Sequence, residues 1–158
     1  MDVLRTMPWL PVPSLAVSFT MCTRMYKPKS ALNIDSKCED SMMPPNSTAE
    51  FCNFGIEAYR SPMLNVKQHT IYAITGGRPD LLATYDNADT INWKMCSVKR
   101  RYRGISLGMA LFDIECEDWA NVCHAHTKEL ANQTRIRAVV DYFRNKATVR
   151  VHSNVNCP

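Results

Sequence analysis

The sequence lacks several features that would each assign a protein to a class. No apolar run approaches the ~20 residues that a membrane-spanning helix needs. No cleavable signal core is visible at the N-terminus, because residues 1–5 begin acidic and Pro8, Pro11 and Pro13 interrupt the apolar positions. No two cysteines have the CxxC spacing of zinc or redox sites. We therefore expect no membrane partner, no metal and no cofactor.

Concentrated positive charge is also missing. The net charge of +4 is spread over the 158 residues, and the densest basic run, residues 99–103, falls where a helix is expected to end. We therefore expect no nucleic-acid partner. His124 and His126 alternate beside Cys123, but two histidines at this spacing in a loop are more typical of surface residues than of metal ligands.

Cysteine is what the sequence has in quantity. Seven cysteines are many for a cytosolic protein and indicate an oxidising compartment. Acceptor triplets for N-glycosylation at Asn46 and Asn132 agree with that compartment. The sequence therefore predicts a secreted, extracellular glycoprotein. Because no signal is visible, we expect the chain to begin in the middle of a larger protein.

Hydrophobic patterning predicts strands and helices in alternation. Residues 15–21 alternate as in a strand, and residues 105–112 are apolar on both faces, as in a parallel strand covered on both sides. Helices are predicted from Asp86 or Asn87, either of which can cap, to residue 101, and from about residue 127 to 145.

The segment between the first strand and the first helix has a different character. Residues 27–50 have loop chemistry, and the short segments 51–59, 70–74 and 82–85 indicate a small α+β unit. The order strand, insertion, helix, strand, helix is typical of an α/β barrel.

Several stretches resemble the family 18 glycoside hydrolases, the chitinases and chitinase-like proteins. Residues 85–91, YDNADTI, are similar to the family's Y-D-D-x-x-S-I, and residues 104–119 to the G-x-M-x-W-S-L-D-x-D-D-F of the eighth barrel strand and its loop. The likeness is colinear from about residue 11 to 123. Residues 11–15 correspond to the family's proline-containing entry to the seventh strand, and residues 17–26 to its pattern V-G-L-P-x-Y-G-R-S-F. Residues 51–54 are similar to the family's Y-E-I-C-D-F, and residues 71–73 to its V-P-Y-A.

This resemblance implies an α/β fold that is part of a (β/α)8 barrel, with strands seven and eight and their helices. Residues 1–26 would be the end of helix six and strand seven, and 27–85 a loop and the α+β insertion. Residues 86–146 would be helix seven, strand eight and helix eight, and 147–158 a tail. The connection between the two strands is a right-handed crossover in this topology, so we expect them to pair in parallel. Because two barrel strands cannot bury their own inner face, we expect their edges to associate with another chain.

The resemblance also implies a disulfide between Cys52 and Cys123. In the chain-entropy model, closing a loop of about 70 residues stabilises by about 4 kcal/mol. Spacing leaves the other pairings open. Cys96 with Cys116 is our second choice, because the helix and the loop after the last strand should be neighbours.

One family feature is absent. The family cleaves β-1,4-linked N-acetylglucosamine polymers with a D-x-x-D-x-D-x-E run, an exception to the two-carboxylate scheme. The chain has no such run, so we expect no hydrolase activity. The acidic side chains at the eighth-strand loop are interpreted as solvated loop carboxylates; they are Asp113, Glu115, Glu117 and Asp118.

The resemblance implies chitin or chitooligosaccharide as the ligand of the full-length protein. Phe112 aligns with the tryptophan under the sugar, and Arg24 with the arginine of strand seven, whereas Cys22 and Thr23 replace the family's tyrosine and glycine. The candidate binding residues are therefore Phe112, Arg24 and Asp113. The alternative interpretations are that Phe112 is a core aromatic residue and that Arg24 only forms an ion pair with a carboxylate at the end of the barrel.

Two hypotheses follow. In the first, the chain is the C-terminal part of a secreted chitinase-like protein that binds or hydrolyses chitin, with the catalytic segment elsewhere. In the second, it is a complete small secreted protein, stapled by cysteines and derived from the barrel, that acts by interaction. Six further barrel strands encoded upstream of Met1 would decide for the first.

Overall fold

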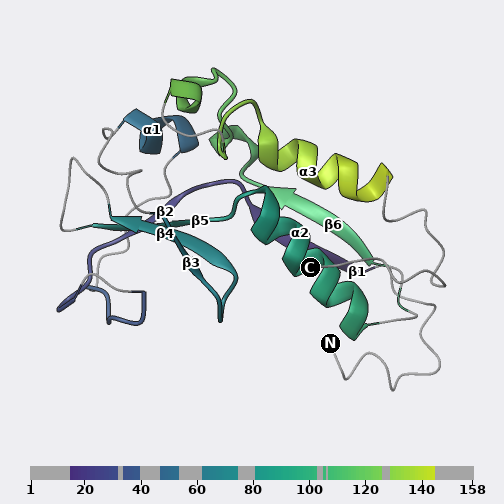
Figure 1. Ribbon diagram of the computed structural model, residues 1–158, viewed down its shortest axis with the longest axis horizontal. Helices are drawn as coiled ribbons and strands as arrows, with labels where there is room; N and C mark the ends of the chain where they lie inside the picture. The colour runs from purple at the N-terminus through teal and green to yellow at the C-terminus, as the bar shows by residue number, and fades with distance from the viewer. Residues whose placement is uncertain are drawn as a thin grey trace.

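The computed structural model describes residues 15–31, 34–39, 47–53, 62–74, 81–102, 105, 107–125 and 129–144. It contains a two-stranded sheet and a four-stranded sheet side by side (Figure 1). In the first sheet β1 (Leu15–Thr20) and β6 (Leu107–Phe112) pair in parallel, with Leu15 opposite Leu107 and Thr20 opposite Phe112. The predicted parallel pairing of the two apolar segments is confirmed.

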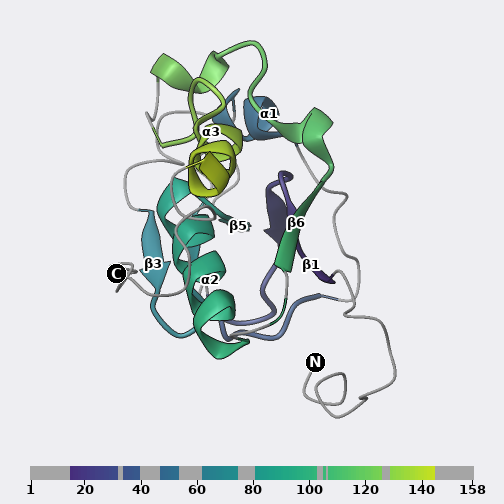
Figure 2. The ribbon, with the colours of Figure 1, turned by 90° about the vertical axis from the view of Figure 1, so that its right-hand side faces the viewer.

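Two helices, α2 (Ala88–Arg101) and α3 (Thr134–Tyr142), cover one face of this parallel pair. Figure 2 shows both helices on the same side of β1 and β6. The core between them contains apolar side chains that alternate along the strands. They include Val17, Phe19, Met109 and Leu111 from the strands, and Ile91, Met95, Ile136, Val139 and Tyr142 from the helices.

The beginning of α2 follows from its capping residues. The Asn87 side chain accepts a hydrogen bond from the Thr90 backbone N–H at 2.9 Å, and the Thr90 hydroxyl accepts one from the Asn87 backbone N–H at 3.0 Å. This reciprocal arrangement satisfies two donors that the first turn leaves free. Of the two predicted capping residues, Asp86 and Asn87, the structure has Asn87 as the cap.

The last helix is shorter than predicted. The prediction of a helix from about residue 127 was wrong, because Asn132 and Gln133 have φ angles of 55° and 56°. A right-handed helix cannot pass through this left-handed backbone region. α3 therefore begins at Thr134, and Leu130 is buried in the turn before it.

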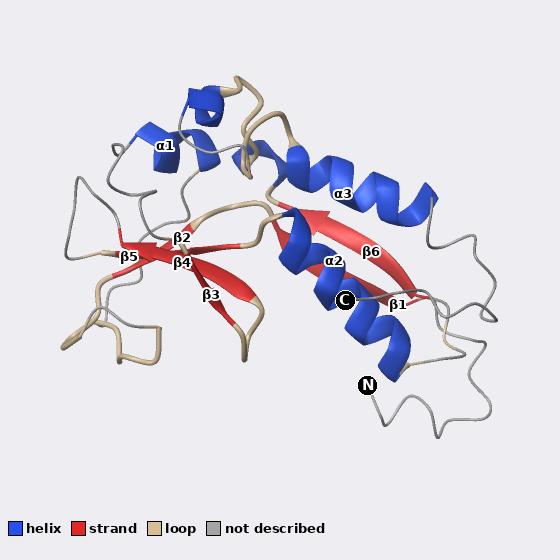
Figure 3. Cartoon of the chain, in the orientation of Figure 1, coloured by secondary structure: helices blue, strands red, loops and turns tan. Residues whose placement is uncertain are grey.

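Three strands of the four-stranded sheet fall within residues 27–85, where the α+β insertion is predicted, and the fourth, β2, precedes them (Figure 3). Its antiparallel strands lie in the order β2-β5-β4-β3. Met25, Ile71 and Ala83 project from one face toward Phe51 and Leu130. The predicted segments 70–74 and 82–85 are both strands. The bounds are β2 Arg24–Tyr26, β3 Met63–Asn65, β4 Thr70–Ile74 and β5 Leu82–Tyr85, with the short helix α1 at Thr48–Asn53.

Two disulfides between described residues join the loop after β6 to the segment between β1 and β2 and to α1. Cys52 is bonded to Cys123, the pair that the family resemblance implies. Cys116 is bonded to Cys22, so the predicted pair of Cys96 with Cys116 was wrong. The physical reason is the parallel register, which brings the ends of β1 and β6 together and leaves the Cα atoms of Cys22 and Cys116 only 4.8 Å apart. Cys96 is buried in the core under α2.

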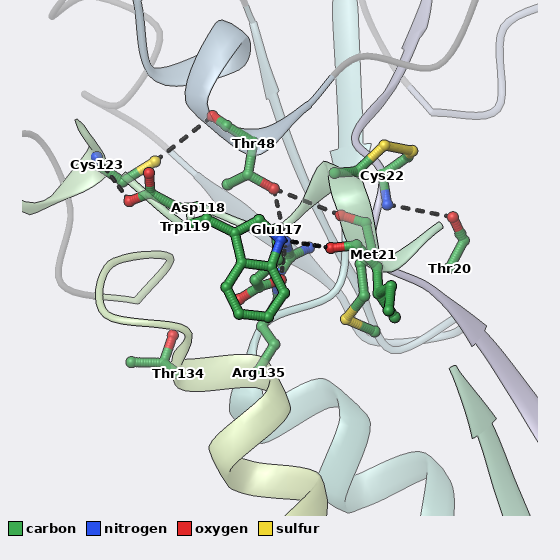
Figure 4. Close-up of polar contacts among 12 residues, drawn as sticks. Thr20, Met21, Cys22, Thr48, Glu117, Asp118, Trp119, Cys123, Thr134 and Arg135 are labelled. Atoms are coloured by element: carbon green, nitrogen blue, oxygen red, sulfur yellow. Dashed lines mark hydrogen bonds and ion pairs between the residues drawn. A yellow bond between two sulfur atoms is a disulfide. The ribbon is translucent and has the colours of Figure 1, made fainter. Parts of the chain in front are cut away.

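A buried ion pair holds this loop to the rest of the chain (Figure 4). Arg135 of α3 is fully buried and pairs with Glu117, which is 2% exposed. The Arg135 guanidinium also donates to the Thr48 hydroxyl at 2.6 Å, and that hydroxyl donates to the Met21 carbonyl at 3.4 Å. The pair thus connects α3, the loop after β6, α1 and the end of β1.

Glu117 and its neighbour Asp118 are not solvated loop carboxylates, so that interpretation was wrong for both. Burial raises the pKa of Glu117, and the charge of Arg135 and its hydrogen bond to Glu117 oppose this shift. Asp118 is fully buried and accepts the backbone N–H groups of Val122 at 2.8 Å and Cys123 at 2.9 Å. Of Glu115, Glu117 and Asp118, only Glu115 is exposed. Two buried carboxylates therefore hold the loop in place.

The first prediction concerns the buried pair. Arg135→Met leaves Glu117 buried without its cation, so we expect the free energy of unfolding to fall by about 3–5 kcal/mol in urea denaturation. Combining it with Glu117→Leu removes both charges, and this double variant should be more stable than Arg135→Met alone. Arg137→Met, on the exposed side of the same helix, is the control and should change stability by less than about 0.5 kcal/mol. A loss in Arg135→Met no larger than in the control would contradict the assigned role.

The second prediction follows from the uncovered face of the parallel pair. Ala16, Ser18 and Phe112 are exposed on the side opposite the helices, and in the described residues β1 and β6 have no further strand beside them. Such edges template pairing with another chain. We expect the isolated chain to associate or aggregate in size-exclusion chromatography with light scattering. A monodisperse monomer with a sharp, reversible calorimetric transition would instead favour the complete small protein.

Candidate functional site

The predicted binding residues come together where β1 and β6 end. The Asp113 carboxylate accepts a hydrogen bond from the Thr20 hydroxyl at 2.6 Å, and the Arg24 guanidinium lies 3.6 Å from the same carboxylate oxygen. Both charged side chains are about one-third exposed. The structure therefore forms the ion pair weighed for Arg24 and leaves both partners accessible to a ligand.

Backbone geometry fixes where the Asp113 carboxylate lies. Asp113 follows the last residue of β6 and has a φ of 55°, in the left-handed region that aspartate visits more readily than most residues. This residue ends the strand and begins a short 3-10 helix, Ile114–Cys116. Because the Thr20 hydroxyl holds the carboxylate across the sheet, the turn presents its charge at the carboxyl ends of both strands.

Phe112 lies at the same end of the sheet. It is 57% exposed and opposite Thr20, on the face that α2 and α3 do not cover. Among the described residues Phe112 therefore takes no part in the core between the strands and the two helices, and its role as a sugar platform stays a prediction. Phe112 directly precedes Asp113, the ion-pair partner of Arg24. An exposed ring and a carboxylate at this end of the sheet offer an apolar face and a hydrogen-bonding group, and a sugar ring can use both.

The two predicted glycosylation sites differ in what the structure describes. Asn132 is exposed in the turn before α3, so its side chain is accessible to modification. Asn46 lies outside the described residues. His124 is exposed and His126 lies outside the described residues. Among the described residues no group of three metal-ligating side chains gathers, and no helix there is long and apolar enough to cross a membrane.

Sequence reasoning missed three features around this site. Thr20 holds Asp113, yet threonine in a strand gives no signal of such a role. Cys22, two positions from both Thr20 and Arg24, is bonded to Cys116, and spacing did not predict this pairing. Trp119 is 54% exposed in the loop after β6, and its indole N–H donates to the Ile114 carbonyl at 2.9 Å.

A separate hollow lies on the insertion sheet. It encloses about 220 Å³, and the described residues that line it include Tyr26, Leu82, Thr84 and Cys38 but none with a charge. Cys38 is exposed and has a free thiol. The register places Arg24 opposite Thr84 and Tyr26 opposite Leu82, so the hollow opens on the sheet face that carries Arg24.

No family model and no curated protein matches this sequence. Solved structures do match. Human YKL-39, described as a pseudo-chitinase with retained chitooligosaccharide binding properties, superposes with a TM-score of 0.58 at 15% identity over 84% of this chain. YKL-39 solved with the tetrasaccharide GlcNAc4 gives 0.58 at 16% identity over 83%. The chitinase RmChi1 of Rhizomucor miehei gives 0.55 at 14% identity over 84%.

These neighbours are much longer than the chain. The matched region covers 36% of each YKL-39 chain and 39% of the Rhizomucor chitinase. At such identities the likeness establishes the fold, and it agrees with the family 18 resemblance read from residues 11–123. The chain therefore has the fold of one part of a chitinase-like protein.

Proposed function

We propose that the chain is the C-terminal part of a secreted chitinase-like protein and that it binds chitooligosaccharide without hydrolysing it. The observation that carries this proposal is the grouping of Phe112, Asp113 and Arg24 at one end of the parallel pair. The fold neighbour YKL-39, described as a pseudo-chitinase that retains chitooligosaccharide binding, supports the combination of binding without hydrolysis.

Each residue of the group has a chemical role in the proposal. The Phe112 ring stacks on the apolar face of an N-acetylglucosamine ring, where C–H groups meet the aromatic surface. Arg24 donates to hydroxyl or acetamido oxygens, and Asp113 accepts from hydroxyl groups. The ion pair between them keeps both side chains oriented before the ligand arrives, which reduces the entropy lost on binding.

The absence of hydrolysis in the proposal rests on the sequence. Family members need the D-x-x-D-x-D-x-E run, whose glutamic acid protonates the leaving oxygen, and this chain contains no such run. Export is supported by the two disulfides, which persist in oxidising compartments.

The third prediction is that the purified chain releases no sugar. Incubation with chitin and with fluorogenic chitooligosaccharides should give the same signal as the heat-denatured protein. Turnover above that control would show that this chain carries a catalytic acid of its own and would contradict the non-hydrolytic part of the proposal.

The fourth prediction concerns binding of GlcNAc4, measured by isothermal titration calorimetry. Phe112→Ala removes the stacking face, and we expect about tenfold weaker binding. Phe112→Trp offers a larger face and should bind more tightly than the wild type. Arg24→Gln should also weaken binding because a charge-assisted donor is lost.

Leu64→Ala is the matched control for these variants, since Leu64 is an exposed apolar residue on β3, in the insertion sheet. It should leave the affinity for GlcNAc4 unchanged. Equal affinities in the wild type, Phe112→Ala and Arg24→Gln would contradict the assigned site, and no binding by the wild type would contradict the proposed function.

A further inference from the structure

Cys96 of α2 is buried and already bonded. Its side chain is 1% exposed and lies in the core that α2 and α3 form with β1 and β6, in one cluster with Met95 and Tyr142. Its sulfur belongs to a disulfide. A cysteine of another molecule could not bring its own Cα atom to bonding distance of so deeply buried a residue. The bond partner of Cys96 is therefore a cysteine of the same chain.

Elimination identifies this partner. The sequence contains seven cysteines. Four of them form the two disulfides described above, Cys22 with Cys116 and Cys52 with Cys123. Cys38 is exposed and has a free thiol. The cysteine that remains is Cys157, which lies outside the described residues.

We propose that Cys96 and Cys157 form a third disulfide, which ties the end of the chain to α2. The chain leaves α3 close to Cys96, because Tyr142, the last residue of α3, shares the core with Cys96 and its ring centre lies 5.9 Å from the Lys99 ammonium. The 13 positions from residue 144 to 157 can span at most about 45 Å. This segment is long enough to fold back onto α2.

The bond forms by thiol–disulfide exchange while the chain folds. One cysteine thiolate attacks a low-molecular-weight disulfide, such as oxidised glutathione, and releases one small thiol, which leaves a mixed disulfide on the protein. The second cysteine thiolate attacks this mixed disulfide and releases the second small thiol. Two protein thiols are thereby oxidised, and the small disulfide is reduced to two thiols, which take up the two protons. The two other disulfides require the same oxidising compartment.

The third bond changes how α3 is held. The other two disulfides end at Cys123, so α3 lies outside both covalent rings, although its Arg135 holds the loop after β6 through Glu117. A bond between residues 96 and 157 encloses the whole of α3 in a ring and limits its separation from α2 and Glu117. This bond forms whether or not the chain binds a saccharide, so its failure would leave the proposed function untouched.

A tryptic map of the oxidised chain tests the bond directly. The full chain is alkylated without reduction in denaturant and then digested. Trypsin cleaves after Lys94, Lys99 and Arg150, so Cys96 lies on peptide 95–99 and Cys157 on peptide 151–158. The other five cysteines lie on peptides 6–24, 38–60 and 104–128. We expect peptides 95–99 and 151–158 to be joined to each other and separate from the other three, with alkylation at Cys38 alone.

Two results of the map would overturn the bond. One is alkylation of Cys96 or Cys157, which would show that the thiol is free. The other is peptide 151–158 joined to peptide 38–60, which would show that the end of the chain is bonded in the segment around Cys38 instead.

Hydrogen exchange with mass spectrometry tests the effect on α3. Cys157→Ser opens the ring, so amide exchange in α3 should become at least about tenfold faster, whereas exchange in β4 and β5 should stay the same. Cys38→Ser is the matched control, because it removes an exposed free thiol, and it should change neither segment. Equal exchange of α3 in the wild type and Cys157→Ser would overturn the role of the bond in holding this helix.

Discussion

A buried cation, Arg135, joins the segments that build the described part of the fold. Arg135 is fully buried and forms an ion pair with the Glu117 carboxylate in the loop after β6. The pair is imperfectly satisfied, since among the described residues neither the Arg135 Nε nor the Glu117 Oε1 has a hydrogen-bond partner. Replacing such a pair by apolar side chains often costs nothing, whereas removing one member is costly. In this fold the pair determines that α3, the loop after β6 and α1 pack together.

The segments that the cation joins are those that build the surface of the candidate site. Arg135 connects α3 to Thr48 of α1, and through Thr48 to the carbonyl of Met21 at the end of β1. Glu117 lies in the loop that presents Asp113 on one side and Trp119 on the other. The site therefore sits on elements whose relative positions are set by buried polar contacts and two disulfides, and only its outer side chains are free to meet a ligand.

Local signals in the sequence predicted local structure well. Asn87 was one of the two residues predicted to cap α2, and the alternation along β1 and β6 located both strands. Long-range contacts could not be read in this way. Glu117 and Asp118 look like surface residues because acidic clusters usually are, and the cation that compensates Glu117 comes from a different helix.

Other failures have equally specific causes. The start of α3 depends on left-handed backbone at Gln133, a conformation that its residue type does not favour. The partner of Cys116 depends on strand register, which cysteine spacing does not encode. The candidate site residues were found only because the resemblance to family 18 supplied positions, and their exposure and mutual contacts required the structure.

The two disulfides interleave along the sequence, since one spans positions 22 to 116 and the other positions 52 to 123. Every peptide bond between residues 22 and 123 consequently lies inside at least one covalent ring. An extracellular protease that cuts the chain once anywhere in this interval separates no fragment from it. The two parts of a cleaved molecule stay bonded to each other. A single cleavage in the long loop after β2 would therefore split the reduced chain into two fragments, whereas the oxidised molecule would gain only the mass of one water.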